Sequence, residues 1–277
     1  MSAPDTVDPR SQDAVNSPPT PVPAHGQFAT AWRFALLEQT RNRFAGVLLA
    51  VFVPTWYLLM DAIVGKTPLS FRLFATGRIL TVDGRELTLI TAGLNSLSLI
   101  VGFAVFAAIR STLAFDRRLV FAGYRNRALI GAKVLAVTVV AFGVALYAAA
   151  VLLIYWRPAA TEWLAVSAGF AVIALVYGAF GLFLGVLVRG DLEGFFLIIM
   201  VGLVDTFLQN PLGNPLANKP VLEWFPSFGP MQFAVGSSLG HAWLWGHLAL
   251  GLAWAAAFTA AGLAVFHLRT RSRRHAT

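Results

Sequence analysis

The sequence LTLITAGLNSLSLIVGFAVFAAI, from Leu87 to Ile109, contains no charged side chain. The hydrocarbon core of a bilayer is about 30 Å thick, and roughly 20 residues of helix cross it. An uncharged stretch of this length is typical of a transmembrane helix. We therefore expect this segment to cross a membrane, and we expect the flanking sequence to show the same pattern.

The overall composition agrees with a membrane protein. Of the 277 residues, 57% are hydrophobic and only 12% are charged, whereas a soluble domain is typically about 25% charged. The net charge of +8 does not indicate a nucleic-acid partner, because most basic residues lie at the ends of apolar blocks, where they orient a membrane protein. The absence of cysteine excludes disulfides and thiolate chemistry.

The apolar blocks predict an all-α integral membrane protein with six transmembrane helices. The fifth block is short, because its residues would reach only about 22 Å as a helix. Pro54 lies inside the first block, where a membrane helix tolerates it. The predicted spans are residues 44–64, 87–109, 128–155, 163–188, 194–208 and 241–268.

The two ends of the chain differ from this core. Residues 1–27 are rich in proline and polar residues and predict a disordered tail. Residues 28–43 predict an amphipathic helix at the membrane interface, with a plain cytoplasmic extension of the first span as the alternative. Residues 269–277 form a basic tail.

The distribution of Lys and Arg predicts the orientation. With both termini inside, the inner segments hold fifteen of these residues and the outer segments hold six. The positive-inside rule therefore places both termini in the cytoplasm and the protein in the cell membrane. Aromatic residues near the predicted outer ends agree with this orientation: Trp56, Tyr57, Tyr155, Trp156, Trp163, Trp243 and Trp245.

Two predicted outer segments are not simple loops. RILTVDGRELTL, residues 78–89, predicts a hairpin turning at Asp83-Gly84, with an irregular loop as the alternative. Phe225 to Leu239 is apolar but too short to cross, and we expect it to be re-entrant or interfacial. The alternative is a surface loop among the lipid headgroups.

The inner segment FDRRLVFAGYRNR, Phe115 to Arg127, holds four arginines and one aspartate. Asp116 could cap a short helix that Gly123 ends, with Leu119 and Phe121 on its apolar face. An apolar patch with a charged rim indicates a docking surface. Alternatively, these arginines only fix the topology and contact lipid phosphates.

Motifs for chemistry are missing from the sequence. VGKT, Val64 to Thr67, lacks the glycine that a P-loop needs at position 60, so we expect no ATP site. No HExxH motif or carboxylate cluster predicts a metal site, and no catalytic triad can be inferred. We therefore expect a chain that is not an enzyme and binds no cofactor itself.

Polar residues within the predicted spans give the remaining indications. Thr88, Thr91, Asn95 and Ser98 form one polar stripe, which fits either a transport pathway or hydrogen bonding between helices. Asp205 and Gln209 lie near the outer end of the fifth span. An acid within a membrane indicates a functional site, unless it is solvated at the interface. Three small residues of the fourth span predict close packing within the chain or a dimer contact: Gly178, Gly181 and Gly185.

The order of these segments resembles the membrane subunits of ABC-2 type exporters. That family has an interfacial helix, six spans, a cytoplasmic coupling helix between spans two and three, and a re-entrant element between spans five and six. The resemblance runs from about Phe28 to Arg271. It is strongest in TVDGRELTLITAGLNSLSLIVG, in DRRLVFAGYRNRALIGAKVLA, and in LQNPLGNP followed by WFPSFGPMQ.

The resemblance implies a function. The chain would be the permease of an exporter for hydrophobic or amphipathic substrates, such as drugs, natural products or lipids. Its partners would be two copies of a separate ATPase subunit, which binds ATP and Mg, and a second permease chain in a homodimer. The ATPase-coupling residues would be Asp116, Arg117, Arg118, Leu119, Phe121, Gly123, Tyr124 and Arg125. The substrate pathway would include Thr88, Thr91, Asn95, Ser98, Asp205 and Gln209.

Two other classes remain as alternatives. A secondary carrier or channel that works without an ATPase would use embedded charges that titrate, and Asp205 is the one plausible candidate in the sequence. An integral membrane enzyme would need a cluster of catalytic side chains at one membrane face.

Overall fold

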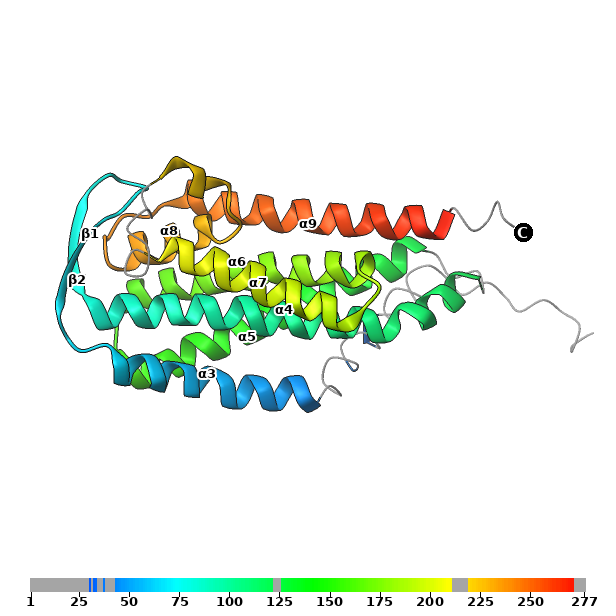
Figure 1. The fold of residues 1–277 in the computed structure, drawn as a ribbon, viewed down its shortest axis with the longest axis horizontal. Coiled ribbons are helices and arrows are strands. Elements are labelled where there is room, and N and C mark those ends of the chain that lie inside the picture. The colour runs from blue at the N-terminus through cyan, green and yellow to red at the C-terminus, as the bar shows by residue number, and fades with distance from the viewer. Residues whose placement is uncertain are drawn as a thin grey trace, which may run out of the picture.

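The computed structural model describes residues 30, 32, 33, 37, 43–121, 126–210 and 219–271. It is mostly helical (Figure 1). The predicted tail 1–27 lies outside the described residues, as does most of the predicted interfacial helix. Of the predicted basic tail 269–277, the first three residues belong to the last helix and residues 272–277 lie outside the description. The elements are α3 (Arg43–Ile63), β1 (Pro68–Arg72), β2 (Ile79–Asp83), α4 (Gly84–Phe121), α5 (Asn126–Tyr155), α6 (Ala160–Leu187), α7 (Asp191–Gln209), η1 (Pro220–Trp224), α8 (Phe228–Ser238) and α9 (Trp245–Arg271).

Within the described residues, four helices are long and apolar enough to cross a membrane. They are Gly84–Thr112, Gly131–Tyr155, Ala160–Leu187 and Trp245–Leu268. This content is that of an α-helical membrane protein. Two further helices run beside them in the bundle, α3 with 21 residues and α7 with 19 (Figure 1). Helix α7 begins before the predicted fifth span and reaches about 28 Å, which is closer to the thickness of a bilayer core.

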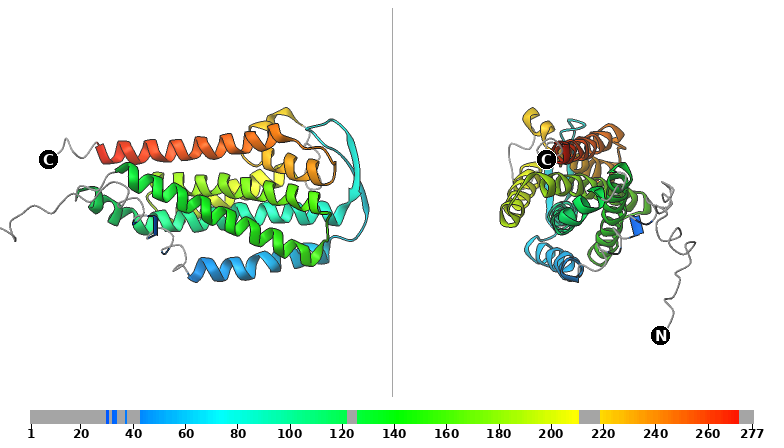
Figure 2. Two further views of the ribbon diagram at one scale, coloured as in Figure 1. Left: turned by 180° about the vertical axis from the view of Figure 1, so that it is seen from behind. Right: turned by 90° about the vertical axis from the view of Figure 1, so that its right-hand side faces the viewer.

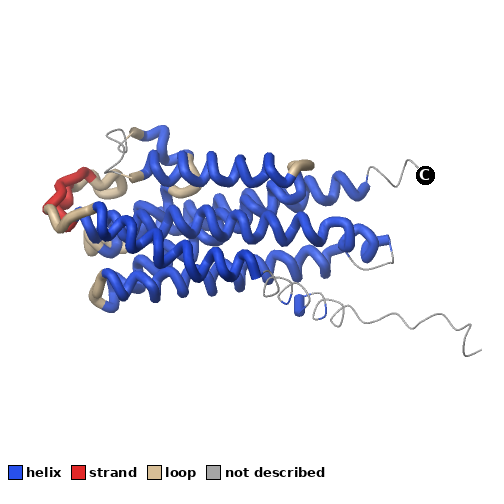
Figure 3. The backbone as a smooth tube through the Cα atoms, turned by 60° about the horizontal axis from the view of Figure 1, so that its bottom comes forward, coloured by secondary structure: helices blue, strands red, loops and turns tan. Residues whose placement is uncertain are grey.

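The helices run along the long axis of the bundle, and the strands are confined to one end (Figure 3). That end also holds α8, the end of α3 and the start of α9 (Figure 1). The opposite end holds the start of α3, the end of α4 and the end of α9, as the view from behind also shows (Figure 2). The start of α3 and the end of α9 therefore lie at the same end of the bundle as the end of α4 and the start of α5.

Helix α6 is the centre of the bundle, and small residues allow its neighbours to approach. A Cβ atom on Gly181 would lie 2.4 Å from the carbonyl oxygen of Gly102 in α4. A Cβ on Gly185 would lie 2.8 Å from Ile109, and one on Gly178 would lie 3.1 Å from Val137 of α5. The predicted glycine face is therefore used for packing within the chain.

The hairpin predicted over residues 78–89 was wrong, because Gly84 to Leu89 belong to helix α4; a hairpin lies earlier in the chain, over residues 68–83. Strands β1 and β2 pair antiparallel, with Pro68 opposite Asp83, and the turn between them contains Gly77 at φ +65°. Asp83-Gly84 instead starts α4. The Asp83 carboxylate accepts a hydrogen bond from the Arg85 amide at 2.9 Å, as a residue at a helix start does. An ion pair between Arg85 and Asp61 joins the same end of α4 to α3.

Candidate functional site

The side chain of Asp205 is buried inside the bundle, on helix α7, four residues before that helix ends. One carboxylate oxygen accepts hydrogen bonds from the Tyr177 hydroxyl at 2.6 Å and from the Ser227 amide at 2.9 Å. The other accepts one from the Ser227 hydroxyl at 2.6 Å. Only 1% of Asp205 is exposed, so the alternative of solvation at the interface was wrong. The carboxylate joins α7 to α6 and to the residue before α8.

Gln209, one turn further along α7, extends this contact. Its side-chain amide donates to the carbonyl oxygen of Leu222 in η1 at 3.1 Å. The other atom of the amide, Oε1, is buried with no hydrogen-bond partner among the described residues. We call Asp205, Gln209, Tyr177 and Ser227 the Asp205 cluster. It fastens the end of α7 to the segment that leads into α8.

Helix α8, which follows the segment held by the Asp205 cluster, is packed inside the bundle. All eleven of its residues are buried, so this segment is not a loop among the headgroups. A Cβ on Gly229 would lie 2.3 Å from the carbonyl oxygen of His247 in α9, which shows how closely the two helices approach. On its other side, Gln232 accepts a hydrogen bond from the Ala75 amide in the hairpin turn at 3.1 Å.

Most side chains of the predicted polar stripe on α4 donate hydrogen bonds to the backbone of α4 itself. Thr88, Thr91 and Ser98 donate to carbonyl oxygens three or four residues earlier, at 2.7, 3.0 and 2.8 Å, as polar residues in apolar surroundings do. Asn95 is the member that reaches another helix, since its amide donates to the Thr206 hydroxyl of α7 at 2.5 Å. Hydrogen bonding between helices, one of the two predicted uses, therefore accounts for Asn95.

The structure brings some of the predicted pathway residues together and reveals others. Asn95 contacts Thr206, which is next to Asp205 in the sequence, so the middle of the stripe lies beside the Asp205 turn. Tyr177 and Ser227 were not predicted. Tyr177 could have been noticed as one of two hydroxyl residues, with Ser167, in the apolar run of α6, whereas nothing in the sequence points to Ser227.

The predicted coupling segment begins as part of α4. The backbone stays helical to Phe121, so Asp116 does not start a separate short helix, and its predicted capping role was wrong. A cap needs a non-helical residue, but the turns before Asp116 are already helical. The description covers only the backbone of residues 113–121, which include Arg117, Arg118, Leu119 and Phe121. Gly123, Tyr124 and Arg125 lie outside the described residues.

The extension of α4 is long. Its apolar part ends at Thr112, and the helix continues about 14 Å beyond that residue. It passes the neighbouring end of α7 (Figure 1).

No group of three or more His, Asp or Glu side chains in the described part of the chain could hold a metal ion. The arrangement offers buried hydrogen-bonding groups inside the bundle and a basic helical extension at the end opposite the hairpin. Searches of known protein families and of curated proteins found no match for this chain.

Proposed function

We propose that this chain is the membrane subunit of an ABC exporter of the ABC-2 type. It moves a hydrophobic or amphipathic substrate out of the cell. Two copies of a separate ATPase subunit supply the energy by hydrolysing ATP with Mg. Two permease chains form a homodimer in the cell membrane, with all termini in the cytoplasm.

The observation that carries the proposal is the extension of α4 at the end of the bundle where α3 starts and α9 ends (Figure 1). This is the position that a coupling helix between spans two and three would have. At the opposite end, the buried helix α8 lies between α7 and α9 in the chain and would be the re-entrant element of this proposal. In this proposal α3 and α7 also cross the membrane, which would give six spans with the four long apolar helices.

The basic residues of the extension are the proposed contact with the ATPase. In the sequence, Arg117, Arg118 and Arg125 flank the apolar residues Leu119 and Phe121, and in this proposal they supply a positive rim to an apolar contact. Such a rim pairs with acidic residues around a cleft and selects the correct partner.

The proposed substrate pathway follows the contact between α4 and α7. Oδ1 of Asn95 and Oε1 of Gln209 are buried acceptors without partners among the described residues. An unpaired buried acceptor costs about 1–3 kcal/mol, so a substrate that offers a hydrogen-bond donor gains by approaching these two atoms. A change in the tilt of α4 against α7 breaks the Asn95–Thr206 bond and opens this route.

A secondary carrier is the second candidate, because Asp205 is a buried carboxylate within the bundle. Its three donors are uncharged and hold two other elements against α7. This arrangement makes Asp205 a structural anchor, which favours the first proposal.

Affinity purification of the full-length protein from its native membrane tests the proposal. We expect an ATPase subunit to co-purify in equal amount. The triple variant Arg117→Glu, Arg118→Glu, Arg125→Glu should lose it. Arg78→Glu, at the hairpin end, is the matched control and should retain it. If the protein purifies alone and transports substrate in liposomes without ATP, the permease proposal fails and the carrier replaces it.

A further inference from the structure

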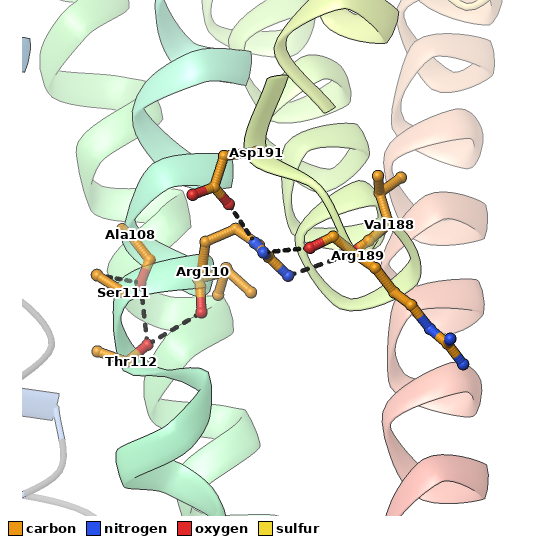
Figure 4. Close-up of polar contacts among 8 residues, drawn as sticks. Ala108, Arg110, Ser111, Thr112, Val188, Arg189 and Asp191 are labelled. Atoms are coloured by element: carbon orange, nitrogen blue, oxygen red, sulfur yellow. Dashed lines mark hydrogen bonds and ion pairs between the residues drawn. The ribbon is translucent and has the colours of Figure 1, made fainter. Parts of the chain in front are cut away.

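Arg110 of α4 binds the connection between α6 and α7 (Figure 4). Its Nε donates to the carboxylate of Asp191 at 2.7 Å. Its two terminal nitrogens donate to the carbonyl oxygens of Val188 and Arg189, at 3.1 and 2.5 Å. One side chain therefore holds the turn after α6 and the first residue of α7.

The groups that Arg110 binds all favour a cation. The carbonyl oxygens that follow α6 have no partner within that helix, and the C-terminal end of a helix carries partial negative charge. The flat guanidinium presents several N–H groups in fixed directions, so it can satisfy two carbonyls and a carboxylate at once. The side chain of Arg189 points away from this contact (Figure 4). Arg189 takes part only through its backbone carbonyl oxygen.

Close packing continues from this contact along α4 and α7. A Cβ on Gly194 would lie 2.0 Å from the Phe106 ring, and the rings of Phe106 and Phe195 lie 5.2 Å apart. Farther along, Gly202 lies against Ser98, where a Cβ would be 3.4 Å from the hydroxyl. Interiors packed this closely transmit displacement, because they have little free volume to absorb it.

Helix α7 is thus held by polar groups near both ends. Arg110 holds Asp191 at its start, and Tyr177 and Ser227 hold Asp205. The two acids are about 21 Å apart along the helix. On the other side, Arg110 lies about 16 Å from the end of the α4 extension at Phe121.

We propose that Arg110 is a positioning residue that passes movement of the α4 extension to α7 and, through α7, to the Asp205 cluster. This inference rests on the proposed function, in which the ATPase displaces the α4 extension. Without the Arg110 contacts, α4 moves at its end while α7 keeps its position.

The chain contains no cysteine, so introduced cysteines can carry spin labels at chosen sites. The side chains of Phe207 in α7 and Ile154 in α5 are 56% and 75% exposed, so we expect both positions to accept labels. Both labels are attached to the Phe207→Cys, Ile154→Cys variant, which is studied in complex with its ATPase in liposomes. Electron spin resonance then measures the distance between the two labels with and without Mg-ATP and vanadate. We expect the distance between the labels to change when the nucleotide is trapped.

Arg110→Gln in this background should abolish the distance change while the ATPase still co-purifies. Arg110→Lys keeps the charge but cannot hold both carbonyls and the carboxylate, so the change should fall by more than half. Arg189→Ala is the matched control: it removes an arginine from the same turn but keeps the carbonyl acceptor, and should retain the full change.

The outcomes separate the two proposals. A chain without a co-purifying ATPase, or without any distance change in the unsubstituted background, contradicts the proposed function. A normal change in Arg110→Gln overturns the role of Arg110 and leaves the proposed function standing. If Arg110→Gln does not assemble, Arg110→Lys decides: a full change in that variant overturns the inference.

Discussion

The hydroxyl group of Tyr147 in α5 donates a hydrogen bond to the carbonyl oxygen of Ala50 in α3, at 3.3 Å. Pro54 lies four residues after Ala50 within the same helix. Because proline has no N–H, the carbonyl of Ala50 lacks its usual helical partner. Tyr147 supplies the missing donor from a neighbouring helix, which is how membrane proteins accommodate proline in a helix.

Tyr147→Phe should therefore lower the free energy of unfolding by about 0.6–1 kcal/mol, as loss of a hydrogen bond between helices does. The same substitution should cost less in a Pro54→Ala background, because the introduced alanine restores the helical N–H. Unfolding of the four proteins in mixed micelles completes a double-mutant cycle. Equal costs in both backgrounds would show that the hydroxyl does not compensate for Pro54.

Asp205→Asn should destabilise the protein by about 2–3 kcal/mol, since removal of a buried charged acceptor weakens three hydrogen bonds at once. The introduced asparagine amide also places N–H groups opposite the donors of Tyr177 and Ser227. Tyr177→Phe removes one donor and should cost about 1.5–3 kcal/mol. The two substitutions should not be additive, because both act on the same cluster. Unfolding midpoints of the single and double variants measure this, and strict additivity would contradict a shared cluster.

Hydropathy predicted most helices well because their apolar runs are long. The predicted span 163–188 compares with α6 at Ala160–Leu187, and 128–155 with α5 at Asn126–Tyr155. The hairpin turn was misplaced because Asp-Gly suits a helix start as well as a turn. The α4 extension was underestimated because its charged residues end the hydropathy signal while the backbone remains helical.

The candidate site was only partly predictable for a different reason. Asp205 and Gln209 stand out in the sequence because polar groups are rare in an apolar run. Their partners Tyr177 and Ser227 lie 28 and 22 residues away from Asp205 in the sequence. Only tertiary packing brings them together, and no local pattern encodes that distance. Arg110 was counted as a topology signal, although its side chain makes three specific contacts.

Gln232→Leu should release the hairpin turn from α8, because the Ala75 amide loses its acceptor. Hydrogen exchange at Ala75 should then accelerate by about tenfold, which corresponds to about 1.4 kcal/mol of lost protection. Ser70→Ala is the control, since it removes only the contact between the Ser70 and Thr81 hydroxyls across the hairpin. Unchanged exchange at Ala75 in Gln232→Leu would mean that the turn stays in place by packing alone.

Gly181→Ala should be among the most damaging single-methyl additions in the bundle. The new Cβ would lie 2.4 Å from the carbonyl oxygen of Gly102, so α4 and α6 must move apart. Overpacking of this kind costs about 1–3 kcal/mol. Gly143→Ala in α5 is the matched control, because nothing lies within 4 Å of its Cβ position. Since alanine is the better helix former, that variant should gain about 0.5–1 kcal/mol. Opposite signs of the two changes in unfolding free energy are expected; a neutral Gly181→Ala would show that the two helices do not meet at this glycine.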